Sequence, residues 1–461
     1  MEGKTNYKII LKKNKFYILF SPIILNTVFN FFVSFSEIFL KFSIYNLIST
    51  FLFFLFLTFV GLNIKESLNL NTISFGICNF ILSFFIFEII NLLMNLNLQF
   101  SSIIFLNLIF WIYIFLLKRN DINLLLYLIS SISALRLFNY FYLNKYEVNV
   151  NIDVDAWYYI ESSKLISKNG YLFSLQNNIF EGYSQFSSYL HSLFHYLNFF
   201  TNNFEYYRST TNVLFFLSIL LIFESTKDFN SKIFTVVLYV CLTLNSDWLN
   251  FLMIDSLMSE GILNYLFATL VFSIFKEENK SLVFFLFGFL IFSKQFYITL
   301  IFLSLPLFIL NKKYRKFSIY LVSGYIFKII IYATRLKDLE RDHHIRQIDL
   351  KDTFFDILLF RNLKVENIIL IFKNLAEDIP LSLFIILMFF LYLYNLKTKK
   401  TFELNYLFFL IFINFILILL LYISVWRSME LESPIRFILN LYLIKFIFLT
   451  KVLDISNKDK V

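Results

Sequence analysis

Long apolar runs constrain the fold of this 461-residue chain more than any other feature. The run that begins at Phe51, Phe-Leu-Phe-Phe-Leu-Phe-Leu, is too apolar to remain in water. Hydrophobic residues make up 59% of the chain and charged residues 16%, against about 25% charged residues in a typical soluble domain. Because a helix needs roughly 17 to 25 apolar residues to cross a bilayer, the sequence predicts an all-α, polytopic membrane protein.

The apolar runs divide the chain into about fourteen predicted transmembrane helices. Their ranges are 16–36, 44–62, 72–96, 100–117, 122–142, 209–225, 231–247, 257–275, 281–294, 296–311, 317–334, 379–396, 402–425 and 435–451. The region 281–311 fits two short spans or one kinked span. The predicted parts are N-terminal transmembrane helices over 1–142, a first outer loop with interfacial helices over 143–208, a transmembrane core over 209–334, a second outer loop over 335–378 and C-terminal transmembrane helices over 379–461.

The distribution of lysine and arginine sets the predicted orientation. Basic residues concentrate in cytoplasmic loops, and a cytoplasmic N-terminus places most basic clusters of the short loops inside. Among the short outer loops, basic residues are then confined to Lys41, Lys294 and Arg427. We therefore expect an inner (plasma) membrane protein of a bacterium with both termini in the cytoplasm. The net charge of +9 lies at the ends of apolar runs, which does not predict nucleic-acid binding. The sequence contains no Walker A or GxGxxG motif, which argues against nucleotide-driven chemistry inside the cell.

Two aspartates mark the first outer loop. Asp153 and Asp155 precede an aromatic run, Trp157-Tyr-Tyr, and acids at the edge of a bilayer are functional candidates. A short helix is predicted over 156–168, because Asp155 suits a helix start and Asn169-Gly170 suits a helix end. Asp155 is accordingly interpreted either as an N-cap or as a functional acid, and an N-cap leaves Asp153 unexplained.

A second helix is predicted over 183–200, where apolar residues recur with helical spacing. The opposite stripe consists of Ser184, Ser188, His191, His195 and Asn198. A further span here would reverse the orientation of every later loop, so we expect this helix to lie flat in the interface with the stripe solvated.

The four histidines are candidates for binding a substrate or acceptor. His191 and His195 are four residues apart, a spacing that suits a metal, but the zinc motif HExxH is absent; a solvated face is favoured. In the second outer loop, His343 and His344 precede Asp349, Asp352 and Asp356. A charge run of this kind is usually solvated, and a divalent cation is the less favoured alternative. Acceptor binding is favoured there over catalysis. The sequence predicts no cofactor, and a divalent cation remains an open alternative.

Glu88, Arg136 and Lys328 are charged residues inside predicted spans. Each is expected to face other helices or a polar cavity, since charge in contact with lipid is unfavourable. Cys78 and Cys241 lie in separate apolar segments and are interpreted as buried small apolar residues.

Ordered landmarks over 150–310 resemble the GT-C membrane glycosyltransferases, which include protein mannosyltransferases, the aminoarabinose transferases of lipid A and the family 39 enzymes. Asp155-Ala-Trp-Tyr-Tyr, with its helix ending at Asn169-Gly170, is similar to their first outer loop. Phe204-Glu-Tyr-Tyr-Arg208 resembles their RLPSAL segment, and Gly288-Phe-Leu-Ile-Phe-Ser-Lys294 resembles their GLALGLAFLTKG segment. Asp255 is similar in place to their second-loop acid, and Arg436-Phe437 resembles their RYLLPL segment. Ala156 stands where the family has a second acid.

The resemblance implies a transferase that moves a sugar from a polyprenyl-phosphate donor to a glycan, lipid or protein acceptor on the extracytoplasmic face. It implies that Asp155, with Asp153 as second choice, deprotonates the acceptor hydroxyl. It also implies that Arg208, Lys294 and Arg436 bind the donor phosphate. The alternatives are a polysaccharide-repeat polymerase or ligase and a flippase or transporter of lipid-linked sugars. The sequence does not identify the sugar or the acceptor.

Overall fold

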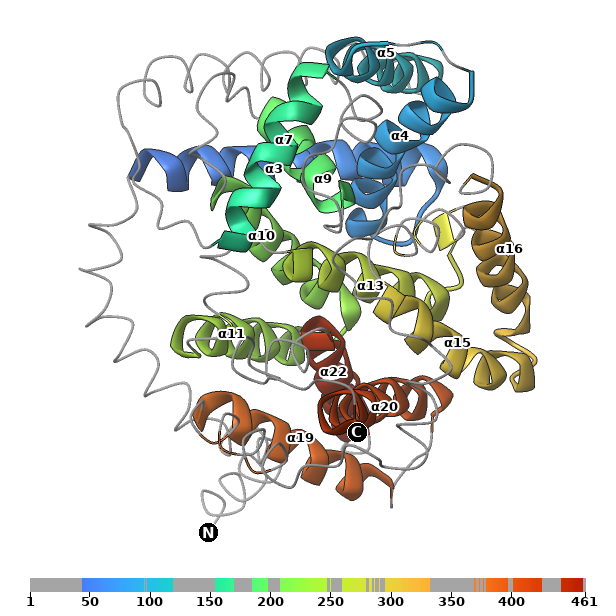
Figure 1. Cartoon of the computed structure of the whole chain (residues 1–461). Coiled ribbons are helices and arrows are strands. Elements are labelled where there is room, and N and C mark those ends of the chain that lie inside the picture. The colour runs from blue at the N-terminus through green and yellow to red at the C-terminus, as the bar shows by residue number, and fades with distance from the viewer. Residues whose placement is uncertain are drawn as a thin grey trace. The chain divides into compact units, whose positions relative to one another are not determined.

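The computed structural model is all-helical in the part of the chain that it describes, as the apolar runs predict (Figure 1). It describes residues 44–94, 98–118, 154–169, 185–197, 208–246, 259–278, 295–331, 379–396, 401–424 and 441–458, with isolated residues between them. Thirteen helices lie in these ranges: α3 (Ile44–Leu68), α4 (Ile73–Met94), α5 (Phe100–Lys118), α7 (Val154–Asn169), α9 (Gln185–Leu197), α10 (Arg208–Ser225), α11 (Phe229–Asn245), α13 (Ser259–Phe275), α15 (Gln295–Leu310), α16 (Arg315–Ile331), α19 (Ile379–Leu396), α20 (Phe402–Ser424) and α22 (Tyr442–Lys458).

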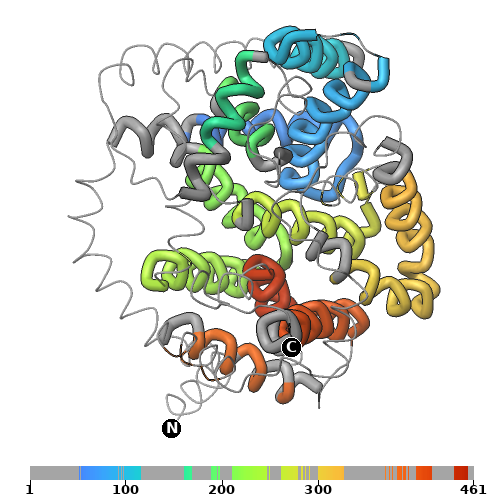
Figure 2. Tube along the Cα trace, viewed as in Figure 1, coloured from blue at the N-terminus to red at the C-terminus, as the bar shows by residue number. Residues whose placement is uncertain are grey.

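The helices form two compact units. Figure 2 follows the Cα trace of the described residues from the N-terminus to the C-terminus. The N-terminal unit contains α3, α4, α5, α7, α9, α13, α15, α16 and α10 up to Leu217. The C-terminal unit contains α10 from Ser218, together with α11, α19, α20 and α22.

Close backbone contact joins α3 to α4 in the N-terminal unit. A Cβ atom at Gly76 would lie 2.0 Å from the carbonyl oxygen of Gly61, so the missing side chains allow the two backbones to touch. The turn between these helices is a Schellman motif, in which the Leu70 amide donates to the Lys65 carbonyl at 2.8 Å. Asn69 adopts the required left-handed conformation, with φ of 54°, which Asn tolerates better than most residues.

Helices α5 and α13 pack on α4. The indole Nε1 of Trp111 on α5 donates to Ser83 Oγ at 2.9 Å, and the Phe87 and Phe110 rings lie 5.8 Å apart. On α13, the Phe272 ring lies 5.4 Å from the Phe75 ring. These contacts make α4 the central helix of this part of the unit.

Helix α22 is the centre of the C-terminal unit. All side chains from Leu441 to Thr450 are buried, and the rings of Tyr442 and Phe446 both pack against Tyr239 on α11. Hydroxyl contacts join α22 to α10 and α11, namely Ser225–Thr450 at 2.9 Å and Thr243–Tyr442 at 2.8 Å.

Helix α22 continues to Lys458, beyond residue 451, where the last predicted span ends. Polar contacts within the protein explain the extension. Lys451 pairs with Glu403 at 2.7 Å, and the Asp454 carboxylate accepts a hydrogen bond from Thr226. The polar side chains at the C-terminal end of α22 therefore find their partners within the protein.

One described helical segment, Ile73–Asn91, combines the length and apolar composition that crossing a membrane requires. Six other segments are apolar but shorter: Phe100–Phe115, Thr210–Ser225, Phe229–Asn245, Gly261–Phe275, Leu300–Leu310 and Phe402–Leu417. The predicted spans 16–36 and 122–142, and most of 281–294, lie outside the described residues. The structure confirms the helical class and not the number of spans.

Candidate functional site

The aspartate-bearing segment forms a helical pair in the N-terminal unit. Both predicted helices are present, as α7 (Val154–Asn169) and α9 (Gln185–Leu197). The N-cap interpretation of Asp155 is wrong, because α7 begins one residue earlier and Asp155 is its second residue. A carboxylate in the first turn of a helix is still favoured by the helix dipole.

Buried serines join α7 to α9. The Ser163 hydroxyl donates to the Ser188 carbonyl at 3.0 Å. The Ser192 hydroxyl lies 2.8 Å from the Ser163 carbonyl and 2.9 Å from the Ser188 carbonyl. Small side chains allow helices to approach each other closely, and serine hydroxyls can donate hydrogen bonds to backbone carbonyls. The pair is therefore held by reciprocal polar contacts and not by apolar packing alone.

The predicted solvation of the stripe on α9 is wrong at the two positions whose burial is described, Ser188 and His191. Ser188 and His191 are 2% and 0% exposed, and the neighbouring apolar residues of α9 are buried as well. The physical reason is the serine pairing, which allows the polar side of α9 to face α7 and not water. Sequence periodicity identified the stripe but carried no information on what covers it.

Aromatic contacts fix the other side of α9. The Tyr189 ring lies 5.6 Å from Phe85 on α4 and 5.8 Å from Phe100 on α5. The Phe194 ring lies 5.8 Å from Phe53 on α3. Edge-to-face aromatic pairs of this kind add about 0.5–1.5 kcal/mol beyond burial. The segment after the predicted fifth span is thus built into the helical core of its unit.

Three polar side chains with unpaired atoms are buried on the helices around this pair. Glu88 on α4 is 2% exposed and has the Asn91 side chain as a polar neighbour, but neither carboxylate oxygen has a partner of full hydrogen-bond geometry among the described residues. The two side-chain amide atoms of Asn107 on α5 and the Ser162 hydroxyl on α7 also lack a hydrogen-bond partner among the described residues. The antiparallel contacts Ser83–Trp111 and Phe87–Phe110 bring Asn107 near the level of Glu88. Buried polar atoms without partners are unfavourable in an apolar core, which makes each of these three side chains a candidate site residue.

The sequence predicts one of these three residues. Glu88 is buried, as expected of a charged residue in a span. Asn107 and Ser162 were missed, because uncharged polar residues are common in apolar helices and carry no distinct signal. Lys445 on α22, in the C-terminal unit, is 3% exposed and was also missed. The sequence could have identified Lys445, because it is the single charged residue in the run Leu441–Thr450, all of which is buried.

The structure places a minority of the predicted site residues. His191 is buried on α9, whereas for Asp155, His195 and Arg208 it gives the backbone position alone, with Arg208 as the first residue of α10. The remaining candidates lie outside the described residues: Asp153, Asp255, Lys294, His343, His344 and Arg436. Convergence of the acids and the cations therefore stays a prediction. Within the described ranges, no three His, Cys, Asp or Glu side chains are grouped to hold a metal ion.

Comparison with known protein families, with curated proteins and with solved structures gives no match. No family assignment follows for this chain. Its function is therefore argued from its own residues.

Replacing Ser192 by Ala is expected to destabilise the α7–α9 pair. The change removes a buried hydroxyl bonded to carbonyls of both helices, which corresponds to about 1 kcal/mol. Thermal unfolding of the detergent-purified protein measures the loss. Ser167→Ala is the control, because that hydroxyl bonds within its own helix, to the Lys164 carbonyl. Equal shifts in the two variants would contradict a role of Ser192 in joining the helices.

Proposed function

We propose that the chain is an integral membrane glycosyltransferase that takes its sugar from a polyprenyl-phosphate donor at the extracytoplasmic face. Two groups of observations support the proposal. One concerns the surfaces of the described helices, and the other concerns the helix that carries Asp155.

The apolar surface of α5 and α19 supports a location in the membrane. Each helix carries large apolar side chains that are 39–64% exposed. They are Phe105, Leu106, Ile109, Phe110 and Tyr113 on α5, and Leu383, Ile386, Phe389, Phe390 and Leu393 on α19. Contiguous exposed apolar faces mark contact with another apolar phase. A bilayer supplies that phase and agrees with the apolar composition of the chain.

The packing of α7 is the observation that carries the enzymatic proposal. Asp155 lies in the first turn of a helix that is joined to α9 by buried serine contacts. Through α9, the pair packs on α3, α4 and α5. A helix held in this way has a defined position in its unit, which suits a helix that carries a general base. In the predicted topology, Asp155 follows a span and lies at the outer edge of the membrane, where a lipid-linked donor would present its phosphate.

The proposed reaction is a displacement at the anomeric carbon. The Asp155 carboxylate accepts the proton of an acceptor hydroxyl as its oxygen attacks that carbon. A bond forms between the acceptor oxygen and the anomeric carbon, and the bond from this carbon to the phosphate oxygen breaks. Polyprenyl phosphate leaves with the bonding electron pair, and Arg208, Lys294 and Arg436 are the candidate cations for its charge. The carboxyl group then returns its proton to water.

Reconstitution into proteoliposomes with polyprenyl-phosphate sugars tests the proposal. We expect release of free polyprenyl phosphate and appearance of a glycosylated acceptor in equal amounts. Movement of an intact donor across the bilayer would contradict transferase activity and support a flippase. Transfer of whole oligosaccharide repeats would instead support a polymerase.

A further inference from the structure

The turn between α15 and α16 concentrates positive charge at one end of two apolar helices. Lys312, Lys313, Arg315 and Lys316 occur within five residues, and all four are exposed. The Arg315 Nε donates to the Ile309 carbonyl at 2.9 Å, which ties this cation to the end of α15.

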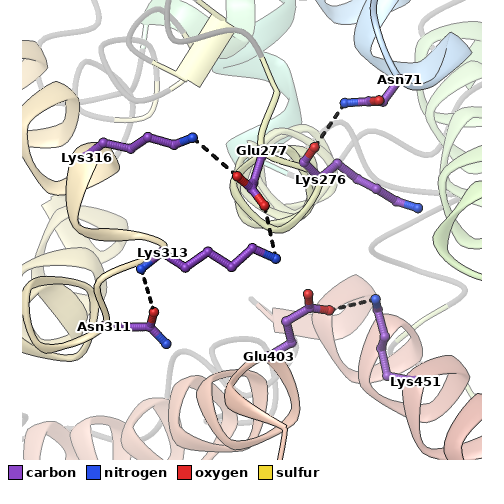
Figure 3. A network of polar contacts seen from close by, with 8 residues as sticks. All are labelled: Asn71, Lys276, Glu277, Asn311, Lys313, Lys316, Glu403 and Lys451. Atoms are coloured by element: carbon purple, nitrogen blue, oxygen red, sulfur yellow. Dashed lines mark hydrogen bonds and ion pairs between the residues drawn. The ribbon is translucent and has the colours of Figure 1, made fainter.

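Glu277, which follows α13, contacts two of these cations at once (Figure 3). Its carboxylate oxygens lie 3.0 Å from Lys313 Nζ and 3.3 Å from Lys316 Nζ. The hydrogen bond from Lys313 is the main reason that the pKa of this carboxyl lies below its usual range. Glu277 is therefore ionised at neutral pH and bridges the two lysines there.

The backbone at Glu277 is held in an unusual conformation. Its φ is 50°, a left-handed region that Gly occupies more easily than Glu. The Glu278 amide donates to the Ser273 carbonyl at 2.9 Å, which completes a Schellman motif. Asn71 secures the same turn, because its side-chain amide donates to the Lys276 carbonyl at 3.0 Å and its backbone amide donates to Glu278 at 2.8 Å. Strained residues of this kind persist where the surroundings hold them and are often functional.

The exposed apolar side chains beside the cations indicate what the turn faces. Ile309 and Leu310 end α15, and Ile319, Val322 and Ile326 lie along α16; all five are exposed, Leu310 at 78%. Among the described residues, Glu277 is the carboxylate that pairs with these cations, and it contacts two of the four, so most of the positive charge stays unbalanced there. A phosphodiester with acyl chains attached complements both features, since its phosphate meets the cations and its chains meet the apolar residues.

We propose that the α15–α16 turn binds the head group of an anionic phospholipid, and that Glu277 competes with the lipid phosphate for Lys313 and Lys316. The position agrees with the orientation predicted from basic residues, which places this turn at the cytoplasmic leaflet. The inference rests on the proposed membrane location and does not depend on glycosyl transfer. A basic turn by itself indicates only which side of the membrane a loop occupies. In this turn, the Glu277 carboxylate contacts two of the lysines, so a lipid phosphate that binds them has to replace it.

Native mass spectrometry of the full chain, released from nanodiscs of phosphatidylcholine and phosphatidylglycerol, tests the site. Glu277→Gln is expected to retain phosphatidylglycerol on the order of two- to fivefold better than wild type, because it frees two lysines. The double variant Lys313→Gln/Lys316→Gln is expected to lose this retention. Glu277→Gly serves as a second release variant, because glycine accepts the left-handed backbone without strain. Glu403→Gln is the matched control, since Glu403 also pairs with a lysine, Lys451, at 2.7 Å.

Three results would overturn the inference. They are equal retention in wild type and Glu277→Gln, a Glu403→Gln effect as large as that of Glu277→Gln, or displacement of phosphatidylglycerol by millimolar glycerol phosphate. The last result would indicate a site for small anions. Failure of the chain to enter nanodiscs would instead contradict the membrane location, and loss of transferase activity alone would leave lipid retention unchanged.

Discussion

Replacing Asp155 by Asn is expected to lower the rate of sugar transfer by about 10²- to 10⁴-fold, the usual contribution of a general base. The amide preserves the size of the side chain but does not accept the proton of the acceptor hydroxyl. Helix α7 is joined to α9 through Ser163 and Ser192, so the substitution is not expected to change folding. Release of polyprenyl phosphate from a lipid-linked sugar, measured in proteoliposomes, reports the rate.

Two further variants interpret that measurement. Glu161→Gln removes another carboxylate from α7, one that pairs with Lys164 at 2.7 Å and is 30% exposed; its effect is expected to stay within about twofold. Asp153→Asn separates the two aspartates. A large loss in Asp153→Asn with full activity in Asp155→Asn would assign the base to Asp153, and full activity in both variants would exclude this loop from the chemistry.

Gly76→Leu is expected to prevent α3 and α4 from packing. A Cβ atom at this position would lie 2.0 Å from the Gly61 carbonyl oxygen and 2.8 Å from its carbonyl carbon. Both are backbone atoms, so the helices must separate to admit the side chain. Overpacking typically destabilises by about 1–3 kcal/mol, occasionally more, and a forced backbone separation belongs at the upper end. The monodisperse fraction after detergent extraction and the thermal unfolding midpoint measure the loss.

Smaller substitutions in the same crossing give a graded comparison. Gly61→Ala is expected to destabilise less than Gly76→Ala, because its new Cβ would come no closer to a backbone atom than 2.9 Å, at the Ile73 carbonyl oxygen, although it would also lie 2.4 Å from Ile77 Cγ1. Leu62→Ala is the control, since Leu62 is exposed on α3. Unchanged stability of Gly76→Ala would contradict the close backbone contact.

Sequence periodicity and apolar length predicted the helices well. The predicted spans 44–62, 100–117 and 379–396 coincide with α3, α5 and α19, apart from a longer C-terminus of α3. The extension arises because Lys65 and Glu66 belong to the helix, although charged residues suggested a loop. A polar residue ends an apolar run without ending a helix, since the backbone hydrogen bonds continue regardless of the side chain.

The candidate site was predicted less completely, for a physical reason. Hydropathy identifies Glu88 because a charge in an apolar run is conspicuous, and it overlooks Asn107 and Ser162 because amides and hydroxyls are not. The burial of Ser188 and His191 depends on which helix covers α9, and that partner, α7, is set by tertiary packing. The local sequence therefore indicated which residues are polar, but it did not indicate which of these residues are exposed to solvent.

Labelling of Asp153→Cys with a membrane-impermeant maleimide tests the central claim most directly. The native cysteines, Cys78 and Cys241, are buried, so the background reaction should be low. If the aspartate-bearing segment borders a donor site outside the membrane, the new thiol should react from the extracytoplasmic side and be protected by a polyprenyl-phosphate sugar. Reaction confined to the cytoplasmic side, or labelling that the donor does not slow, would contradict the account.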